Sequence, residues 1–377
     1  MKKLSYAAAF VVLASMGTPA LAASNGLRLY GLLEIGPEYN SVTYKGKKHA
    51  KVGVGTGAER FGMTGSHAIG SDLSTRFTLE AGLSSADGMG TAGRLFGRQA
   101  SLGLVHQRLG SLDFGRHYNF GSLYESDVDP FGGDFGLAGG DTVLGNGPRV
   151  DNLLLYQTPD LNGWQGGIGY SFGVDDVERD AQNELIKAHR GNGDFFSAGT
   201  YDRLLTAGIK YGGGPLAMVA TFDRAMRRQD ALNAHEGRQI DVYMLGAAYD
   251  MEPVTLYGAF SQTFGGWIAS KNLNDMPEQT SGFRDFQFAR GFAATTGLIG
   301  AQFTSGAHRF MASWQQARPR NARLTGQDKT LNMYSLGYRY AMSKRTALMA
   351  FMAYGRNYAF IHGLNSTQTS MRVQHSF

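Results

Sequence analysis

The connections between the candidate strands constrain this chain most, because short and long ones alternate almost throughout. Short connections fall at 67–71, 107–109, 159–162, 213, 251, 304–306 and 342–344. Long ones fall at 40–56, 118–148, 174–202, 225–238, 265–290, 319–329 and 357–367. A barrel that crosses a membrane sorts its connections in this way, with tight turns at one end and large loops at the other. A soluble sandwich has no reason to do so.

Sixteen segments read as strands, and most run to around ten residues, the length that a tilted membrane strand needs. They lie near 27–39, 57–67, 72–84, 97–106, 110–117, 149–158, 163–173, 203–212, 214–224, 239–250, 252–264, 291–303, 307–317, 330–341, 345–356 and 368–377. The sequence therefore predicts an all-β fold, a 16-stranded antiparallel transmembrane β-barrel.

Polar and apolar side chains alternate within these segments. In 334–340, three tyrosines and a leucine alternate with Ser335, Gly337 and Arg339. In 74–80, the apolar residues alternate with Arg76 and Glu80. Side chains on a strand point to opposite faces in turn, and a charge facing lipid at mid-membrane costs about 2–4 kcal/mol. We therefore expect Arg76 and Glu80 to face a wet interior.

The two ends of the chain agree with this reading. In the last segment, 369–377, Met371, Val373 and Phe377 share one face, and we expect this strand to close the barrel at Phe377 against strand 27–39. At the start, two lysines precede a short apolar stretch and a small-x-small motif, which predicts a cleaved signal peptide at 1–22 and a single barrel domain at 23–377. The apolar stretch is too short for a membrane helix, which needs about 20 residues.

Composition excludes several classes. Cysteine is absent, so neither disulfides nor thiolate metal sites hold the fold together. No long apolar helix follows the signal, which excludes a helical inner-membrane bundle. Removing two signal lysines leaves 36 − 2 = 34 basic residues against 31 acidic ones, a charge near +3. This small excess does not indicate a nucleic-acid partner, which needs a concentrated basic patch.

Several motifs resemble the Gram-negative general diffusion porins. They are Glu59-Arg-Phe-Gly-Met-Thr-Gly65, Phe77-Thr-Leu-Glu80, Phe96-Gly-Arg-Gln-Ala-Ser-Leu-Gly-Leu104, Gly110-Ser-Leu-Asp-Phe-Gly-Arg116, Arg149-Val-Asp-Asn-Leu-Leu-Leu-Tyr156 and Arg372-Val-Gln-His-Ser-Phe377. These blocks span nearly the whole chain in order. The resemblance implies a homotrimer in which each subunit holds its own water-filled pore.

The resemblance also implies a pore constriction. The third long connection, 118–148, would fold into the pore and narrow it, with Asp127, Asp129 and Asp134 on the loop. Facing the loop, the family places a ladder of arginines, which the matching motifs put at Arg60, Arg98 and Arg149; alternation adds Arg76, and Glu80 as their counter-ion. The family often has an acidic residue between the proline and the phenylalanine of the loop tip, and this chain has none.

Two questions stay open at this stage. The arginines could line the pore, or they could brace the loop through ion pairs with Asp127 or Asp134. If Arg149 faces inward, so do Leu153 and Leu155. Either the loop packs on these leucines or the pore has a partly apolar wall.

These observations predict a channel in the Gram-negative outer membrane for passive diffusion of small hydrophilic solutes and ions, with a weak preference for anions. We expect no catalytic site, metal or cofactor, and as partners the outer-membrane lipid, lipopolysaccharide and the barrel-assembly machinery. A substrate-selective channel of the same fold is the alternative. A barrel enzyme or an adhesin is disfavoured, because the nine histidines are scattered with no nucleophile motif and an adhesin needs no acidic inward loop.

Overall fold

The computed structural model describes residues 26–132, 135–144, 147, 149–174, 177–179, 185–188, 202–228, 237–268 and 286–377. The expected signal peptide and Asp134 lie outside these residues. The barrel strands are β1 (Gly26–Tyr44), β2 (Lys47–Thr56), β3 (Arg60–Ala68), β4 (Leu73–Gly82), β5 (Gln99–His106), β6 (Gly110–Tyr118), β7 (Arg149–Gln157), β8 (Trp164–Ser171), β11 (Arg203–Gly213), β12 (Leu216–Met226), β13 (Gln239–Asp250), β14 (Val254–Ile268), β15 (Phe286–Ser305), β16 (His308–Pro319), β17 (Leu331–Ala341), β18 (Thr346–Arg356) and β19 (Asn365–Ser376).

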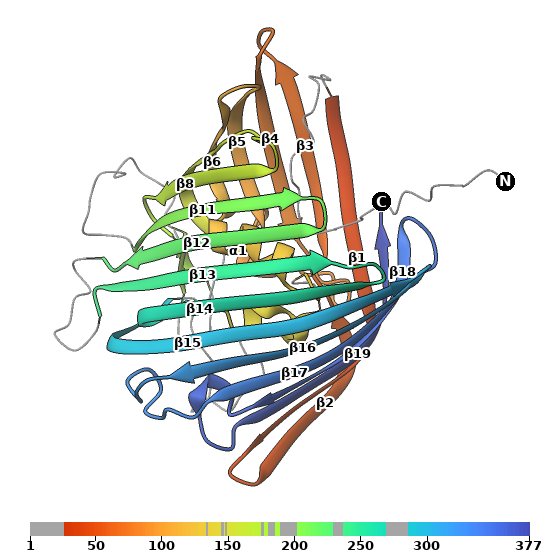
Figure 1. Cartoon of the computed structure of the whole chain (residues 1–377), viewed down its shortest axis with the longest axis vertical. Coiled ribbons are helices and arrows are strands. Elements are labelled where there is room, and N and C mark those ends of the chain that lie inside the picture. Colours follow the sequence, from red (N-terminus) through yellow and green to blue (C-terminus); the bar gives the residue numbers. More distant parts are fainter. Residues whose placement is uncertain are drawn as a thin grey trace.

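These segments form one closed antiparallel barrel (Figure 1). β2 and β3 both pair with β1: β2 with its second half, residues 35–44, and β3 with its first half, residues 26–32. They are therefore two parts of one interrupted strand. Counted in this way, the seventeen paired segments make the sixteen strands of the predicted barrel. A separate two-stranded ribbon is formed by β9 (Val177–Arg179) and β10 (Leu185–Ala188).

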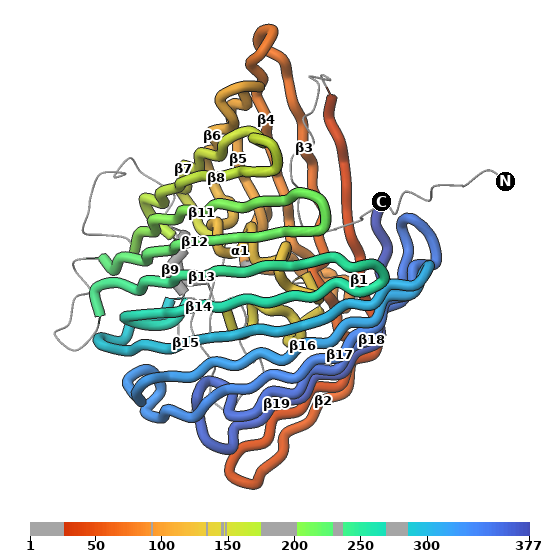
Figure 2. The backbone as a smooth tube through the Cα atoms, in the orientation of Figure 1, coloured from red at the N-terminus to blue at the C-terminus, as the bar shows by residue number. Residues whose placement is uncertain are grey.

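The first and last strands close the barrel. β19 runs antiparallel to β1 from Leu32 opposite Ser376 to Thr43 opposite Asn365. Figure 2 shows the two ends of the tube, red and blue, running together along this seam. At its end the backbone of Phe377 exchanges two hydrogen bonds of 3.1 Å with Gly31. The predicted pairing of the terminal strand is confirmed.

Side chains alternate between the two faces of the barrel wall as predicted. On β17, Tyr334 and Leu336 are 48% and 64% exposed on the outside, whereas Ser335 between them is 3% exposed. On β19, Met371 and Val373 are exposed outside and Gln374 is buried inside. Because strand side chains alternate with a period of two, these strands present an apolar face to lipid and the opposite face to the interior.

One expected loop is instead a hairpin. The connection 40–56 was assigned to a long external loop, but β1 continues to Tyr44, turns at Lys45 and Gly46, and returns as β2. Both turn residues have positive φ, at 49° and 75°, which suits the two-residue turn of a hairpin. The run of lysines in this stretch reads as a loop because lysine is uncommon in strands.

The long connection after β6 carries most of the helical structure of the described residues. It contains α1 (Phe120–Glu125), η2 (Ser126–Val128), η3 (Gly136–Ala138) and η4 (Gly140–Thr142); short turns elsewhere are η1 (Thr91–Gly93) and η6 (Tyr358–Phe360). Among the described residues, no helix is long and apolar enough to cross a membrane.

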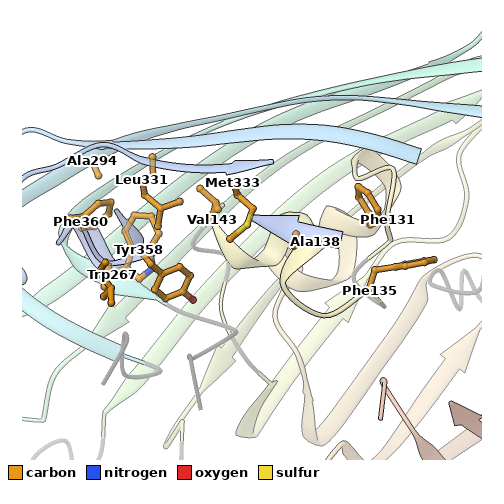
Figure 3. Packing of buried hydrophobic residues seen from close by; sticks show 14 of the residues in the cluster. Phe131, Phe135, Ala138, Val143, Trp267, Ala294, Leu331, Met333, Tyr358 and Phe360 are labelled. Carbon is orange, nitrogen blue, oxygen red and sulfur yellow. The ribbon is translucent and has the colours of Figure 1, made fainter. Parts of the chain in front are cut away.

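Two apolar clusters hold this connection against the barrel wall. In one, Phe131 and Phe135 (Figure 3) pack edge to face, with ring centroids 5.5 Å apart. The Phe135 ring also packs against Phe351 of β18, with centroids 5.8 Å apart. In the other, Phe120 and Tyr124 of α1 belong to the same buried group as Leu153 and Leu155. The inward leucines of β7 are therefore covered by the loop, which answers the question left open by the sequence.

Candidate functional site

The loop at 118–148 is tied to the inward faces of distant strands. Buried Gln315 of β16 donates from Nε2 to the carbonyl oxygens of Ala138 and Gly139, at 3.0 and 3.2 Å. Further anchors are Gln368 accepting from Leu137 N at 2.7 Å, Ser261 donating to Leu144 O at 2.8 Å, and Thr206 accepting from Phe120 N at 2.8 Å. Only β8 separates β11 from β7, but β14, β16 and β19 lie far round the barrel, so the loop reaches across the inner side.

The predicted loop acids have separate surroundings. Asp129 is buried, and its two carboxylate oxygens accept from Phe131 N at 3.1 Å and Gly140 N at 2.9 Å. Such bonds to backbone N–H groups brace the loop fold, so Asp129 differs from the exposed pore-lining acid that we expected. Asp127 accepts from Lys210 Nζ of β11 at 3.1 Å.

The Asp127–Lys210 pair lies against the loop helix. The Lys210 ammonium sits 5.0 Å from the ring centroid of Tyr124, whose hydroxyl accepts from Gln157 at 3.1 Å. Burial raises the pKa of Tyr124 to about 12, so its hydroxyl stays neutral at any working pH. The ion pair therefore lies between β11 and the Tyr124 ring of α1.

Three of the four predicted arginines form a ladder. Arg60 and Arg149 begin β3 and β7, and Arg98 directly precedes β5. Glu80 of β4 is buried between the first two: Arg98 Nε donates to it at 2.6 Å, and Arg60 Nε lies 3.8 Å from its other oxygen. Tyr30 donates its hydroxyl to the same carboxylate at 2.9 Å. The structure therefore brings together Glu80, Arg60 and Arg98 as the sequence predicted.

Tyr118 joins the third arginine to the ladder. Its hydroxyl accepts from Arg98 Nη2 at 3.2 Å and also from Arg149. The Arg149 guanidinium stacks on the Tyr118 ring, 4.2 Å from its centroid. Sequence reasoning missed Tyr118 and Tyr30. Alternation along β1 places Tyr30 inward without revealing its contact, whereas the irregular pairing of β6 with β7 after Gly115 breaks the alternation before Tyr118.

The fourth predicted arginine belongs to a separate pair. Arg76 Nη2 lies 2.6 Å from Asp113 of β6. A further pair of arginines, Arg94 and Arg116, holds Asp151 at 2.7 Å each. Arg94 was missed because it lies before β5, in a stretch with no strand pattern.

Among the described residues, arginines outnumber carboxylates on this wall. Six arginines (Arg60, Arg76, Arg94, Arg98, Arg116 and Arg149) contact three described carboxylates (Glu80, Asp113 and Asp151) directly or through Tyr118, which gives +6 − 3 = +3 for these side chains. The ladder alone gives +3 − 1 = +2. Within the described part of the chain, no group of three or more His, Asp or Glu side chains is placed to hold a metal ion.

A closed 16-stranded β-barrel with an apolar outer belt and a charged interior is the architecture of an outer-membrane channel. The Gram-negative porin family model matches residues 7–359, and the chain belongs to that family. An outer membrane porin protein of Bordetella pertussis is 36% identical over the whole of both chains. Outer membrane porin protein 32 of Delftia acidovorans is 26% identical over 93% of this chain and 88% of its own.

Solved structures agree on the fold. An anion-selective porin from Comamonas acidovorans superposes with a TM-score of 0.70 at 20% identity, covering 94% of this chain and 100% of that one. The protein is thus an outer-membrane porin of Gram-negative type, a passive channel and not an enzyme.

Proposed function

We propose that this porin is a general diffusion channel for small hydrophilic solutes with a weak preference for anions, and that the loop 118–148 narrows its pore opposite the arginine ladder. One observation carries the proposal: among the described residues, the ladder sets Arg60, Arg98 and Arg149 against one carboxylate, that of Glu80. Adding the charge of Asp134, which lies outside the described residues, leaves the sum positive at +3 − 2 = +1. Rings of charged side chains set the ion preference of a pore, and arginine stays charged at all working pH values.

The loop supplies little opposing charge in this proposal. Asp129 accepts from backbone N–H groups of the loop and Asp127 from Lys210, and no ion pair among the described residues joins either carboxylate to the ladder. The porin from Comamonas acidovorans that shares this fold is described as anion-selective. A strongly substrate-selective channel has no comparable support among the described residues.

The proposal is tested by the reversal potential of the purified protein in a planar bilayer under a potassium chloride gradient. We expect the sign of anion preference, and we expect Arg98→Gln to move the potential toward the cation side. Arg108→Gln is the matched control, because Arg108 is exposed on the turn between β5 and β6 and pairs with Asp72 at 3.3 Å. A cation-selective wild type, or equal shifts in the two variants, contradicts the proposal. Conductance that closes in steps of three supports the homotrimer.

The same proposal extends to membrane partners. Beyond the barrel rim, the β1–β2 hairpin exposes Val52 and Val54 on its outer face and carries a basic tip, formed by Lys45, Lys47, Lys48, His49 and Lys51. An apolar stripe below basic side chains suits the boundary between acyl chains and lipopolysaccharide phosphates. We also propose export through the signal peptide at 1–22 and insertion by the barrel-assembly machinery, which would read the strand ending at Phe377.

A further inference from the structure

The inner wall carries glycines at the points where the loop 118–148 touches it. A Cβ atom added to any one of them would lie within 3.0 Å of a loop side chain, closer than such atoms can approach. We call these five inward-facing positions the glycine seats. They are Gly167 of β8, Gly208 of β11, Gly246 of β13, Gly300 of β15 and Gly337 of β17.

The glycine seats follow the course of the loop. The contacts are Phe120 with Gly167 and Gly208, Val128 with Gly246, Pro130 with Gly300, and Phe131 with Gly337. As the loop advances along the chain, its contacts therefore advance through the sheet order from β8 to β17. The first two seats stand directly opposite each other in the pairing of β8 with β11, so together they form one flat platform under the Phe120 ring.

The backbone of the barrel does not itself require glycine at these five positions. None of them is among the glycines with positive φ, so an alanine there could keep the extended conformation of its strand. Glycine inside a strand costs about 0.5–1 kcal/mol relative to alanine, and it often marks a place where another segment approaches closely. The glycine seats therefore allow the loop to lie flat against the wall.

A side chain on a seat would force the loop and the wall apart. At Gly300, an added Cβ would lie 2.6 Å from Cγ of Pro130, whereas two carbon atoms pack best at about 3.5–4.0 Å. One of the two partners must therefore move by about 1 Å. β15 is paired with β14 on one side and with β16 on the other, which holds the wall in place. The loop is the part that moves, and the space open to it lies toward the lumen.

We propose that the glycine seats determine the size limit of the pore, because they fix how close to the wall the loop lies. They are specificity-determining residues for uncharged hydrophilic solutes such as sugars, which the charges of the ladder do not sort. The inference rests on the part of the proposed function in which the loop narrows the pore. It does not depend on the preference for anions.

The test is the swelling of liposomes that contain the full-length protein, with a pentose and with a disaccharide as solutes. Gly300→Ala should lower the ratio of the disaccharide rate to the pentose rate about twofold, because selection in a narrow pore depends on its diameter. Gly246→Ala and Gly337→Ala should lower the ratio in the same direction. Gly297→Ala is the matched control: it lies on the outward face of the same strand, where an added Cβ meets nothing within 4 Å. A ratio in the three seat variants no lower than in Gly297→Ala overturns the proposal.

A double variant identifies the contact that is responsible. Pro130→Ala removes the Cγ and Cδ atoms that an alanine at Gly300 would meet. Added to Gly300→Ala, it should return both the swelling ratio and the unfolding temperature to those of Pro130→Ala alone, which is the coupling expected of residues in contact. The double variant also replaces Gly300→Ala if that single variant does not fold.

Two contrary outcomes can be told apart. If the effects of the two substitutions on the unfolding temperature simply add, the loop does not rest on Gly300 and the glycine seats are wrong. If the unfolding temperatures are coupled but the swelling ratio of Gly300→Ala equals that of wild type, the loop rests on the wall without narrowing the pore. That second result overturns the inference together with the narrowing in the proposed function, and it leaves the proposed anion preference untouched.

Discussion

At the scale of single residues, the ladder depends on a neutral side chain as much as on its charges. The hydroxyl of Tyr118 accepts from both Arg98 and Arg149, and its ring supports the Arg149 guanidinium. The Nε of Arg149 is buried without a hydrogen-bond partner among the described residues, so its position relies on this tyrosine. The orientation of these arginines is therefore set by packing on the barrel wall, which a motif cannot encode.

Replacing Tyr118 by phenylalanine tests this dependence. The variant keeps the ring under Arg149 but removes the acceptor that two arginines share, so we expect a loss of about 1–2 kcal/mol of stability and an altered single-channel conductance. Thermal unfolding followed by heat-dependent gel mobility measures the first, and bilayer recording the second. Tyr156→Phe is the control, since Tyr156 donates to Leu109 O on the exposed outer face. Identical conductance in both variants and wild type would show that Tyr118 does not position the ladder.

At the scale of elements, the alternation of polar and apolar side chains and the lengths of the connections predicted most of the barrel, because each strand must present one apolar face to lipid. The β1–β2 hairpin escaped prediction, since its run of lysines is not typical of strands. Motif matches indicated Arg60, Arg98 and Arg149, and alternation indicated Arg76. Neither indicated the bracing role of Asp129. It depends on the backbone amides of Phe131 and Gly140 meeting one carboxylate, a contact that forms only when the loop folds.

Side-chain hydrogen bonds from the barrel strands hold the loop 118–148 in place. Gln315 suits a test of them, because it donates to two loop carbonyl oxygens. Gln315→Leu leaves the carbonyl oxygens of Ala138 and Gly139 without their side-chain donor, which costs about 1–3 kcal/mol for buried groups. We expect a lower unfolding temperature and larger current fluctuations, because the loop would move more freely in the pore. The neighbouring Gln316 faces outward and donates to Asn332 at 3.0 Å, so Gln316→Leu provides the same change without touching the loop. If the two variants give equally quiet currents, the loop does not depend on Gln315.

At the scale of the whole molecule, the barrel closes through a buried charge cluster that joins its first and last strands. Arg372 of β19 is 2% exposed, and it donates to Glu34 of β1 at 2.7 Å and also to Glu38. Gln374 donates to the other oxygen of Glu34 at 3.0 Å. A one-residue slip between β1 and β19 would turn these side chains to the lipid face, so the cluster favours a single register of closure.

Arg372→Met should therefore lower the stability of the closed barrel more than a substitution in an exposed turn does. The change leaves Glu34 and Glu38 buried without their cation, and breaking a buried ion pair on one side costs about 3–5 kcal/mol. We expect a markedly lower temperature for the transition from folded to unfolded gel mobility. Arg345→Met, in the exposed turn between β17 and β18, should leave that temperature unchanged. Adding Glu34→Gln to Arg372→Met removes one of the stranded charges and should recover part of the loss. If the double variant is no more stable than Arg372→Met alone, the loss comes from packing of the arginine stem against Phe351, 5.0 Å from the guanidinium, and not from charge at the seam.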